Sequence, residues 1–179
     1  MRVLSRQRGV SLIEVLVAML IFSIGVLGIA LMQIKGAQYT KQAGVRTVAV
    51  LQARSLADAM RANPAGVYGV ATPGGIAAKG GDLSDSYYLY TGPAIPSSAG
   101  CANDACRQAH GDLAQWLTQL KAAAPAPVNA NGATNSAALA SVATDDDKGS
   151  LIITLSWSGM AANDSGAAKN DSYRFVFHP

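Results

Sequence analysis

Residues 10–32 read VSLIEVLVAMLIFSIGVLGIALM, an apolar run of 23 residues with one charged side chain, Glu14. As a helix this run would be roughly 34 Å long, which is enough to cross the hydrocarbon core of a bilayer. The preceding segment, residues 1–9 (MRVLSRQRG), carries three arginines and stays on the cytoplasmic side by the positive-inside rule. The sequence therefore predicts a transmembrane segment over about residues 10–32, with the C-terminal part of the chain across the membrane.

The basic balance of the chain belongs to its first nine residues. The sequence has 14 basic and 11 acidic side chains and a pI of about 9.0. Without Arg2, Arg6 and Arg8 the remainder has 11 of each sign. The charge therefore does not indicate a basic surface for nucleic acid, and we expect no nucleic-acid partner.

Glu14 is the residue in the apolar run that needs an explanation. A carboxylate near the hydrocarbon region costs about 3 kcal/mol on insertion scales and marks a functional-site hypothesis. It could rest at the membrane interface near the positive end of the helix, or pair with a cation inside an assembly and fix its register. The apolar run could also be a simple membrane anchor, or a secretory signal cut between Gly25 and Ala30. The length of the run and the early position of its charge disfavour the secretory signal.

Gly9 followed by VSLIEVLVAMLIFSIGVLGI resembles the type III signal of type IV prepilins. By this resemblance Gly9 is the last residue of a cleaved leader, and Val10 is the N-methylated first residue of the mature chain. Glu14 is then the fifth mature residue, which in the family neutralises the N-terminal amine of a neighbouring subunit during assembly. Most members of the family have Phe where this chain has Val10, a substitution that the family tolerates.

The helical pattern continues beyond the apolar run. No proline occurs between Val10 and Asn63, so we predict one helix over residues 10–62 that Asn63 and Pro64 end. Residues 63–179 then form a globular head. Apolar and small residues at helical spacing form the stripe expected to pack on that head: Val45, Val48, Gln52, Leu56 and Ala59.

The head sequence predicts a second helix and short strands. Residues 107–125 (RQAHGDLAQWLTQLKAAAP) have the apolar face of a helix that ends at Pro125. Residues 125–150 are of low complexity and are predicted to be a loop. The predicted strands are residues 86–92 (SYYLYTG), 151–158 (LIITLSWS) and 172–178 (SYRFVFH). The expected fold class is α+β, with a long N-terminal helix packed on a small antiparallel sheet, as in pilins.

Cys101 and Cys106 are the only cysteines, and an even count in an exported chain predicts a disulfide. With His110 they also form a C-x4-C-x3-H string, but the local sequence supplies no fourth ligand for zinc. The acidic residues 145–147 could bind calcium or form a solvated loop, and adjacent carboxylates do not converge without a specific turn. We predict no metal, no cofactor and, for want of a catalytic motif, no enzyme.

Most of the chain resembles minor pilins of the PilV type, the type IV pilus modification proteins. The resemblance rests on IEVLVAMLIFSIGVLGIA, LQARSLADAMRANP, the cysteine pair before DLAQWLTQL, and LIITLSW. The cysteines lie in mid-chain, unlike those around the C-terminal loop of major pilins.

This resemblance implies a minor pilin that enters a type IV pilus or primes its assembly, with a role in adhesion or twitching motility. The implied partners are prepilin peptidase, the major pilin and other minor pilins, the inner-membrane assembly platform and a tip adhesin. The chain would lie in the inner membrane with its head in the periplasm, and then in the pilus. A minor pseudopilin of type II secretion and a membrane-anchored or secreted enzyme are the competing interpretations.

Overall fold

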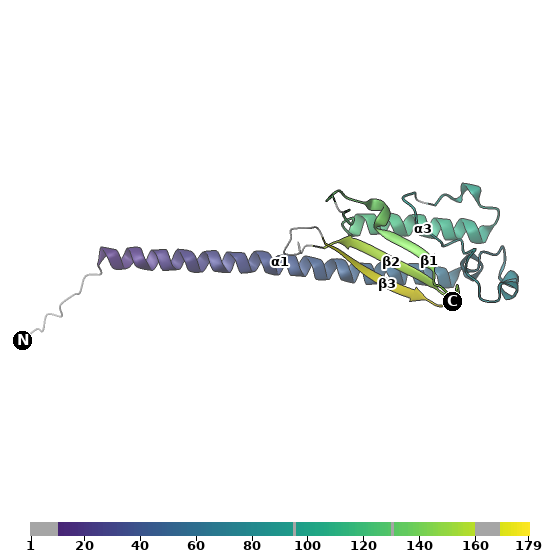
Figure 1. Ribbon diagram of the computed structural model, residues 1–179, viewed down its shortest axis with the longest axis horizontal. Coiled ribbons are helices and arrows are strands. Elements are labelled where there is room, and N and C mark those ends of the chain that lie inside the picture. The colour runs from purple at the N-terminus through teal and green to yellow at the C-terminus, as the bar shows by residue number, and fades with distance from the viewer. Residues whose placement is uncertain (1–10, 95, 130, 160–168) are drawn as a thin grey trace, which may run out of the picture. The chain divides into compact units, whose positions relative to one another are not determined.

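The computed structural model describes residues 11–94, 96–129, 131–159 and 169–179 (Figure 1). The chain divides into two compact units, Met1–Lys41 and Gln42–Pro179. The helices and strands, in chain order, are α1 (Leu12–Ala62), α2 (Pro64–Val67), η1 (Pro73–Lys79), η2 (Ser98–Gly100), α3 (Asp104–Ala123), η3 (Ser136–Ala138), β1 (Ala140–Thr144), β2 (Leu151–Ser158) and β3 (Asn170–Phe177).

In the first unit, the described residues belong almost entirely to α1, and all their side chains are exposed. This part of α1 contains an 18-residue window with a mean hydropathy of 2.8, long and apolar enough to cross a membrane. The hydroxyl of Ser23 donates to the Met19 carbonyl at 2.7 Å, and Thr40 does the same with Gly36. Such bonds to the preceding turn satisfy polar side chains within the helix itself. The predicted helix over residues 10–62 is thus confirmed from Leu12 onward.

The second unit is built around one hydrophobic core that draws side chains from α1, α3 and the sheet. Trp116 of α3 is buried, and its indole N–H donates to the carbonyl of Gln52 at 2.9 Å, which ties α3 to α1. Of the predicted stripe on α1, Leu56 is in the core and Val45 packs against it, while Val48, Gln52 and Ala59 are half-buried. Small side chains allow close packing, and the buried residues of α1 are Ala49, Ala53, Leu56, Ala57 and Met60.

The sheet has three antiparallel strands in the order β1-β2-β3. Alternate side chains of β2 are buried, as expected for a strand with one face on the core. The strands predicted at residues 151–158 and 172–178 are confirmed as β2 and β3, where β3 starts at Asn170. Figure 1 shows the three arrows side by side.

Strand β1 corrects the prediction of a loop over residues 125–150. Its five residues, ASVAT, pair with β2 from Ala140 opposite Leu155 to Thr144 opposite Leu151. Ala140 and Val142 are buried and alternate with half-buried Ser141 and Ala143. Three of the five residues are alanine or serine, which favour a strand only weakly, but the alternation of buried and half-buried residues suits a strand beside β2.

The aromatic segment 86–92 is not a regular strand, which corrects a second prediction. Only Tyr90 pairs in strand fashion, through an isolated bridge with Val142. Upstream, the backbone turns, because Leu89 N–H donates to the Ser86 carbonyl and the Ser86 hydroxyl accepts from Tyr88 N–H. Burial of Tyr88 and Tyr90 against the core holds the segment in place.

Helix α3 confirms the second predicted helix, although it starts three residues earlier, at Asp104. The side chain of Asn103 caps it by accepting the backbone N–H of Cys106 at 2.8 Å. Its apolar face is buried as predicted, and its last residue, Ala123, lies shortly before Pro125. The buried residues of that predicted face are Leu113, Trp116, Leu117 and Leu120.

A buried polar cluster joins the end of α1 to α3. Asn63 accepts the N–H of Gly66, which caps α2, and donates to the carbonyl of Ala105 at 2.9 Å. The hydroxyl of Tyr88 donates to Asp112 at 2.7 Å. Burial and this bond to a carboxylate raise the pKa of Tyr88 above its usual value, so the phenol stays protonated and donating. The cluster therefore fixes the geometry of the helix junction.

We expect Tyr88→Phe to lower the free energy of unfolding by about 1–3 kcal/mol, because Asp112 loses its buried donor. The measurement is denaturant unfolding of the chain in detergent. The matched control is Tyr90→Phe, which removes the hydroxyl of another buried tyrosine two positions along. Equal decreases in the free energy of unfolding for the two variants would contradict a specific stabilising role of the bond between Tyr88 and Asp112.

Candidate functional site

Two places carry the predicted functional residues: the N-terminal turn of α1 and the loop before α3. Glu14 lies in the first turn of α1, where its backbone N–H donates to the carbonyl of Ser11 at 2.9 Å. Gly9 and Val10 lie outside the described residues. Their roles as cleavage site and methylated N-terminus remain predictions from the sequence.

The surroundings of Glu14 are apolar. Its side chain shares a shallow surface with Val15, Ala18, Met19 and Phe22. Within the described part of the chain, the ion pairs involve Asp58, Asp85 and Asp104, and none involves Glu14. The position in the first turn favours a negative charge through the helix dipole, but only by about 0.3–1 kcal/mol at an exposed site. This is less than the cost of placing a carboxylate in hydrocarbon, so a cationic partner would stabilise Glu14 if this end of the helix lay in the membrane.

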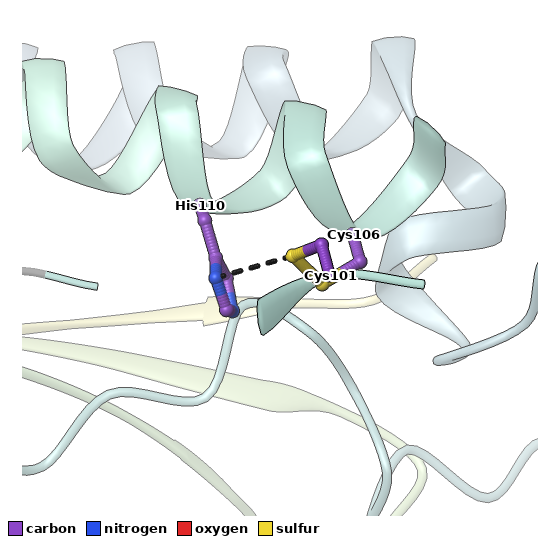
Figure 2. Close-up of side chains that lie close together, drawn as sticks. All are labelled: Cys101, Cys106 and His110. Carbon is purple, nitrogen blue, oxygen red and sulfur yellow. Dashed lines mark hydrogen bonds between the residues drawn. A yellow bond between two sulfur atoms is a disulfide. The ribbon is translucent and has the colours of Figure 1, made fainter. Parts of the chain in front are cut away.

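The two cysteines are joined in a disulfide at the start of α3, with Cα atoms 5.5 Å apart (Figure 2). Cys106 lies in the first turn of α3 and is buried, whereas Cys101 precedes the helix and is half-buried. Closing so short a loop contributes about 2 kcal/mol by loop-entropy arithmetic.

His110 lies beside the disulfide, as Figure 2 shows. Its Nδ1 atom is 3.4 Å from the sulfur of Cys101 and 2.8 Å from the carbonyl oxygen of Ser97. A carbonyl oxygen only accepts hydrogen bonds, so the contact with Ser97 places a hydrogen on Nδ1. The ligand atoms of Cys101, Cys106 and His110 lie within 4.8 Å of one another, but the metal ligand is a thiolate, and these sulfurs are bonded to each other.

The acidic residues 145–147 form a turn. Asp145 accepts the hydroxyl of Ser150 at 2.7 Å and also its backbone N–H. The bond from the hydroxyl lowers the pKa of Asp145. Asp146 and Asp147 are exposed, and among the described residues the three carboxylates do not gather into a cluster. This geometry favours the solvated loop over the calcium site.

Sequence reasoning missed two contacts in this region, one of Cys106 and one of His110. Asn103 caps α3 between the cysteines, and the carbonyl of Ser97 orients His110. An asparagine just before a helix is a recognised capping signal and was available in the sequence. The Ser97 contact runs through a backbone atom, so no side-chain pattern indicates it.

We expect replacement of both Cys101 and Cys106 by alanine to lower the free energy of unfolding by about 2 kcal/mol, the entropy of a short closed loop. Denaturant unfolding of the oxidised wild type and the double variant measures this. Thiol labelling of the unreduced, denatured wild type should find no free cysteine. Labelling of both cysteines would contradict the disulfide.

The chain matches the model of the prokaryotic N-terminal methylation motif over residues 4–30. Neither a curated protein nor a solved structure matches the chain. The matched residues include Glu14 and the first part of the exposed apolar segment of α1. The motif points to a structural protein processed by prepilin peptidase and anchored by its first helix. The chain thus carries a prepilin-type N-terminal motif, which supports a type IV pilin-like protein.

Proposed function

We propose that this chain is a minor pilin, which enters a type IV pilus or primes its assembly through α1 and selects its neighbours through its head. The observation that carries the proposal is the methylation motif over residues 4–30, together with the apolar part of α1, residues 12–34, in which Glu14 is the single carboxylate. So long an exposed apolar surface is unfavourable in water, so it indicates a helix that contacts lipid or other apolar helices.

Processing sets the register of the proposed assembly. Cleavage between Gly9 and Val10 creates a new α-amino group four residues before Glu14. Four residues are about one helical turn, so the amine and carboxylate lie near one end of the same apolar helix. In an apolar assembly a neighbour's amine neutralises Glu14, and only one axial offset of the two helices allows this contact. The ion pair therefore selects register more than it adds stability.

In this proposal the globular head, residues 63–179, determines which proteins the chain binds. Apart from the membrane, the proposed partners are prepilin peptidase, the assembly platform, the major pilin and other minor pilins, with a tip adhesin as a further candidate. The sequence resemblance to the PilV type supports the minor-pilin assignment. A minor pseudopilin of type II secretion shares the leader and the helix, and co-purification with pili or with a secretion apparatus separates the two.

The first experiment concerns processing. In cells with active prepilin peptidase, we expect mass spectrometry of the membrane-extracted protein to show loss of residues 1–9 and one added methyl group on Val10. Gly9→Leu, which places a bulky side chain at the cleavage site, should retain the leader. A wild-type chain that keeps its leader, or that starts after Ala30, would contradict the proposal.

The second experiment concerns Glu14. We expect Glu14→Ala to accumulate normally in the membrane, since removal of the charge eases insertion by up to about 3 kcal/mol. Its abundance in sheared filaments should fall at least roughly tenfold, because the loss of one charge-assisted contact is worth a factor of this order.

The matched control is Ser23→Ala on the same helix, because the Ser23 hydroxyl is already satisfied by the Met19 carbonyl. This variant should enter filaments at the wild-type level. Wild-type incorporation of Glu14→Ala, with normal leader removal, would leave Glu14 as a carboxylate at the membrane interface.

A further inference from the structure

The disulfide lies where it can open without disturbing the core. Neither Cys101 nor Cys106 belongs to the hydrophobic core cluster, which α3 enters at Ala109. Only four residues separate the two cysteines, and Cys101 is the more exposed of the pair. Breaking the bond therefore frees Cys101 and the residues just before α3, while the face of α3 that packs on the core from Ala109 onward keeps its contacts.

Two features stabilise the thiolates that would form on reduction. The Nδ1 atom of His110 lies 3.4 Å from the sulfur of Cys101, and its hydrogen, which the Ser97 carbonyl accepts in the disulfide form, can be shared with a thiolate formed at Cys101. Cys106 lies in the first turn of α3, where the helix dipole favours a negative charge. Hydrogen-bond donors and helix N-termini both favour the thiolate form of cysteine.

The other charged groups nearby largely cancel. Arg107 and Asp104 form an ion pair, and the Arg107 guanidinium also lies 3.5 Å from the carbonyl of Cys101. The hydroxyl of Tyr87 accepts a hydrogen bond from the side-chain amide of Asn103 at 3.0 Å and adds no charge to this region. Among the described residues, His110 has a side-chain nitrogen within hydrogen-bonding distance of the Cys101 sulfur.

We propose that the Cys101–Cys106 disulfide is a thiol–disulfide exchange site, at which a dithiol partner forms a mixed disulfide with Cys101 and His110 stabilises the thiolate of Cys101. This inference does not depend on assembly into a pilus. The partner is defined by its chemistry, a pair of neighbouring thiols that can be oxidised to a disulfide.

The thiol–disulfide exchange takes two steps. A partner thiolate attacks the sulfur of Cys101, the Cys101–Cys106 bond breaks, and Cys106 leaves as a thiolate in the first turn of α3. The partner's second thiolate then attacks the partner's own sulfur in the mixed disulfide and releases the Cys101 thiolate. That thiolate accepts the Nδ1–H of His110. The chain has gained two electrons, and the partner dithiol has become a disulfide.

The test measures the redox equilibrium of the full chain in detergent, with dithiothreitol as the probe. The protein is equilibrated at a series of ratios of reduced to oxidised dithiothreitol, and its thiols are alkylated and counted by mass spectrometry. Since His110 stabilises the reduced form, His110→Leu should shift the equilibrium about tenfold toward the disulfide, the effect of one bond to a charged group.

Two variants control for structural effects. His110→Asn keeps an N–H donor close to the position of Nδ1 and should restore most of the wild-type equilibrium. Gln108→Ala changes an exposed residue on the same helix and should leave the equilibrium unchanged. Circular dichroism confirms that α3 is retained in each variant.

A second readout separates stabilisation of the thiolate from a looser loop. In Cys106→Ser, the rate of alkylation of Cys101 against pH gives the pKa of its thiol, which should lie below the ordinary value of about 8.5. Adding His110→Leu should return it to that value. The proposal is overturned if His110→Leu leaves both the equilibrium and this pKa unchanged, or if dithiothreitol reduces the wild type only in denaturant.

Discussion

Exclusion of water from the apolar part of α1 is the constraint that governs where this protein can reside. From Leu12 to Ile34 this helix exposes large aliphatic and aromatic side chains, among them Ile13, Leu20 and Phe22, with no partner in the described residues. At about 25 cal/mol per Å² of apolar surface, such a helix strongly favours hydrocarbon or other helices over water. Glu14 interrupts this surface once. A single carboxylate in such a setting restricts where the helix can settle, because it needs a compensating cation.

In the second unit, α1 and α3 pack closely with the three-stranded sheet around one core. Alanines at positions 49, 53 and 57 give α1 a smooth buried face, and larger side chains from α3 and the sheet fill the core. Polar contacts then fix the junctions, with Tyr88, Asp112 and Asn63 at one end of α1 and the disulfide at the start of α3. The disulfide ties the half-buried Cys101, which precedes α3, to the buried Cys106 in the first turn of α3, and neither cysteine belongs to the hydrophobic core cluster.

Strong local patterns made much of the fold predictable from the sequence. The apolar run and the absence of proline indicated α1, Leu113 and Trp116 marked the buried face of α3, and the alternation in residues 151–158 indicated β2. The conformations of residues 86–92 and 140–144 were not predicted correctly, because contacts with other parts of the chain determine them. Strand β1 is only five residues long, three of them alanine or serine, and it is stabilised by pairing with β2. Residues 86–92 turn because the Ser86 hydroxyl and carbonyl accept the N–H groups of Tyr88 and Leu89. The sequence makes Glu14 a candidate because of its charge in an apolar run, and its role stays a prediction. The orientation of His110 could not be predicted, because it depends on the backbone carbonyl of Ser97, 13 residues away.

Chemical cross-linking at Glu14 tests directly whether this carboxylate contacts the N-terminal amine of a neighbouring subunit. Glu14 is the only glutamate in the sequence, so an amide formed there is unambiguous in mass spectrometry. Sheared filaments treated with a membrane-soluble carbodiimide should yield an amide between Glu14 of this chain and the N-terminal amine of another subunit. The exposed pair of Lys79 and Asp85, treated in parallel with a water-soluble carbodiimide, serves as the internal standard. Formation of the Lys79–Asp85 amide in filaments that contain no amide at Glu14 would contradict the proposed ion pair.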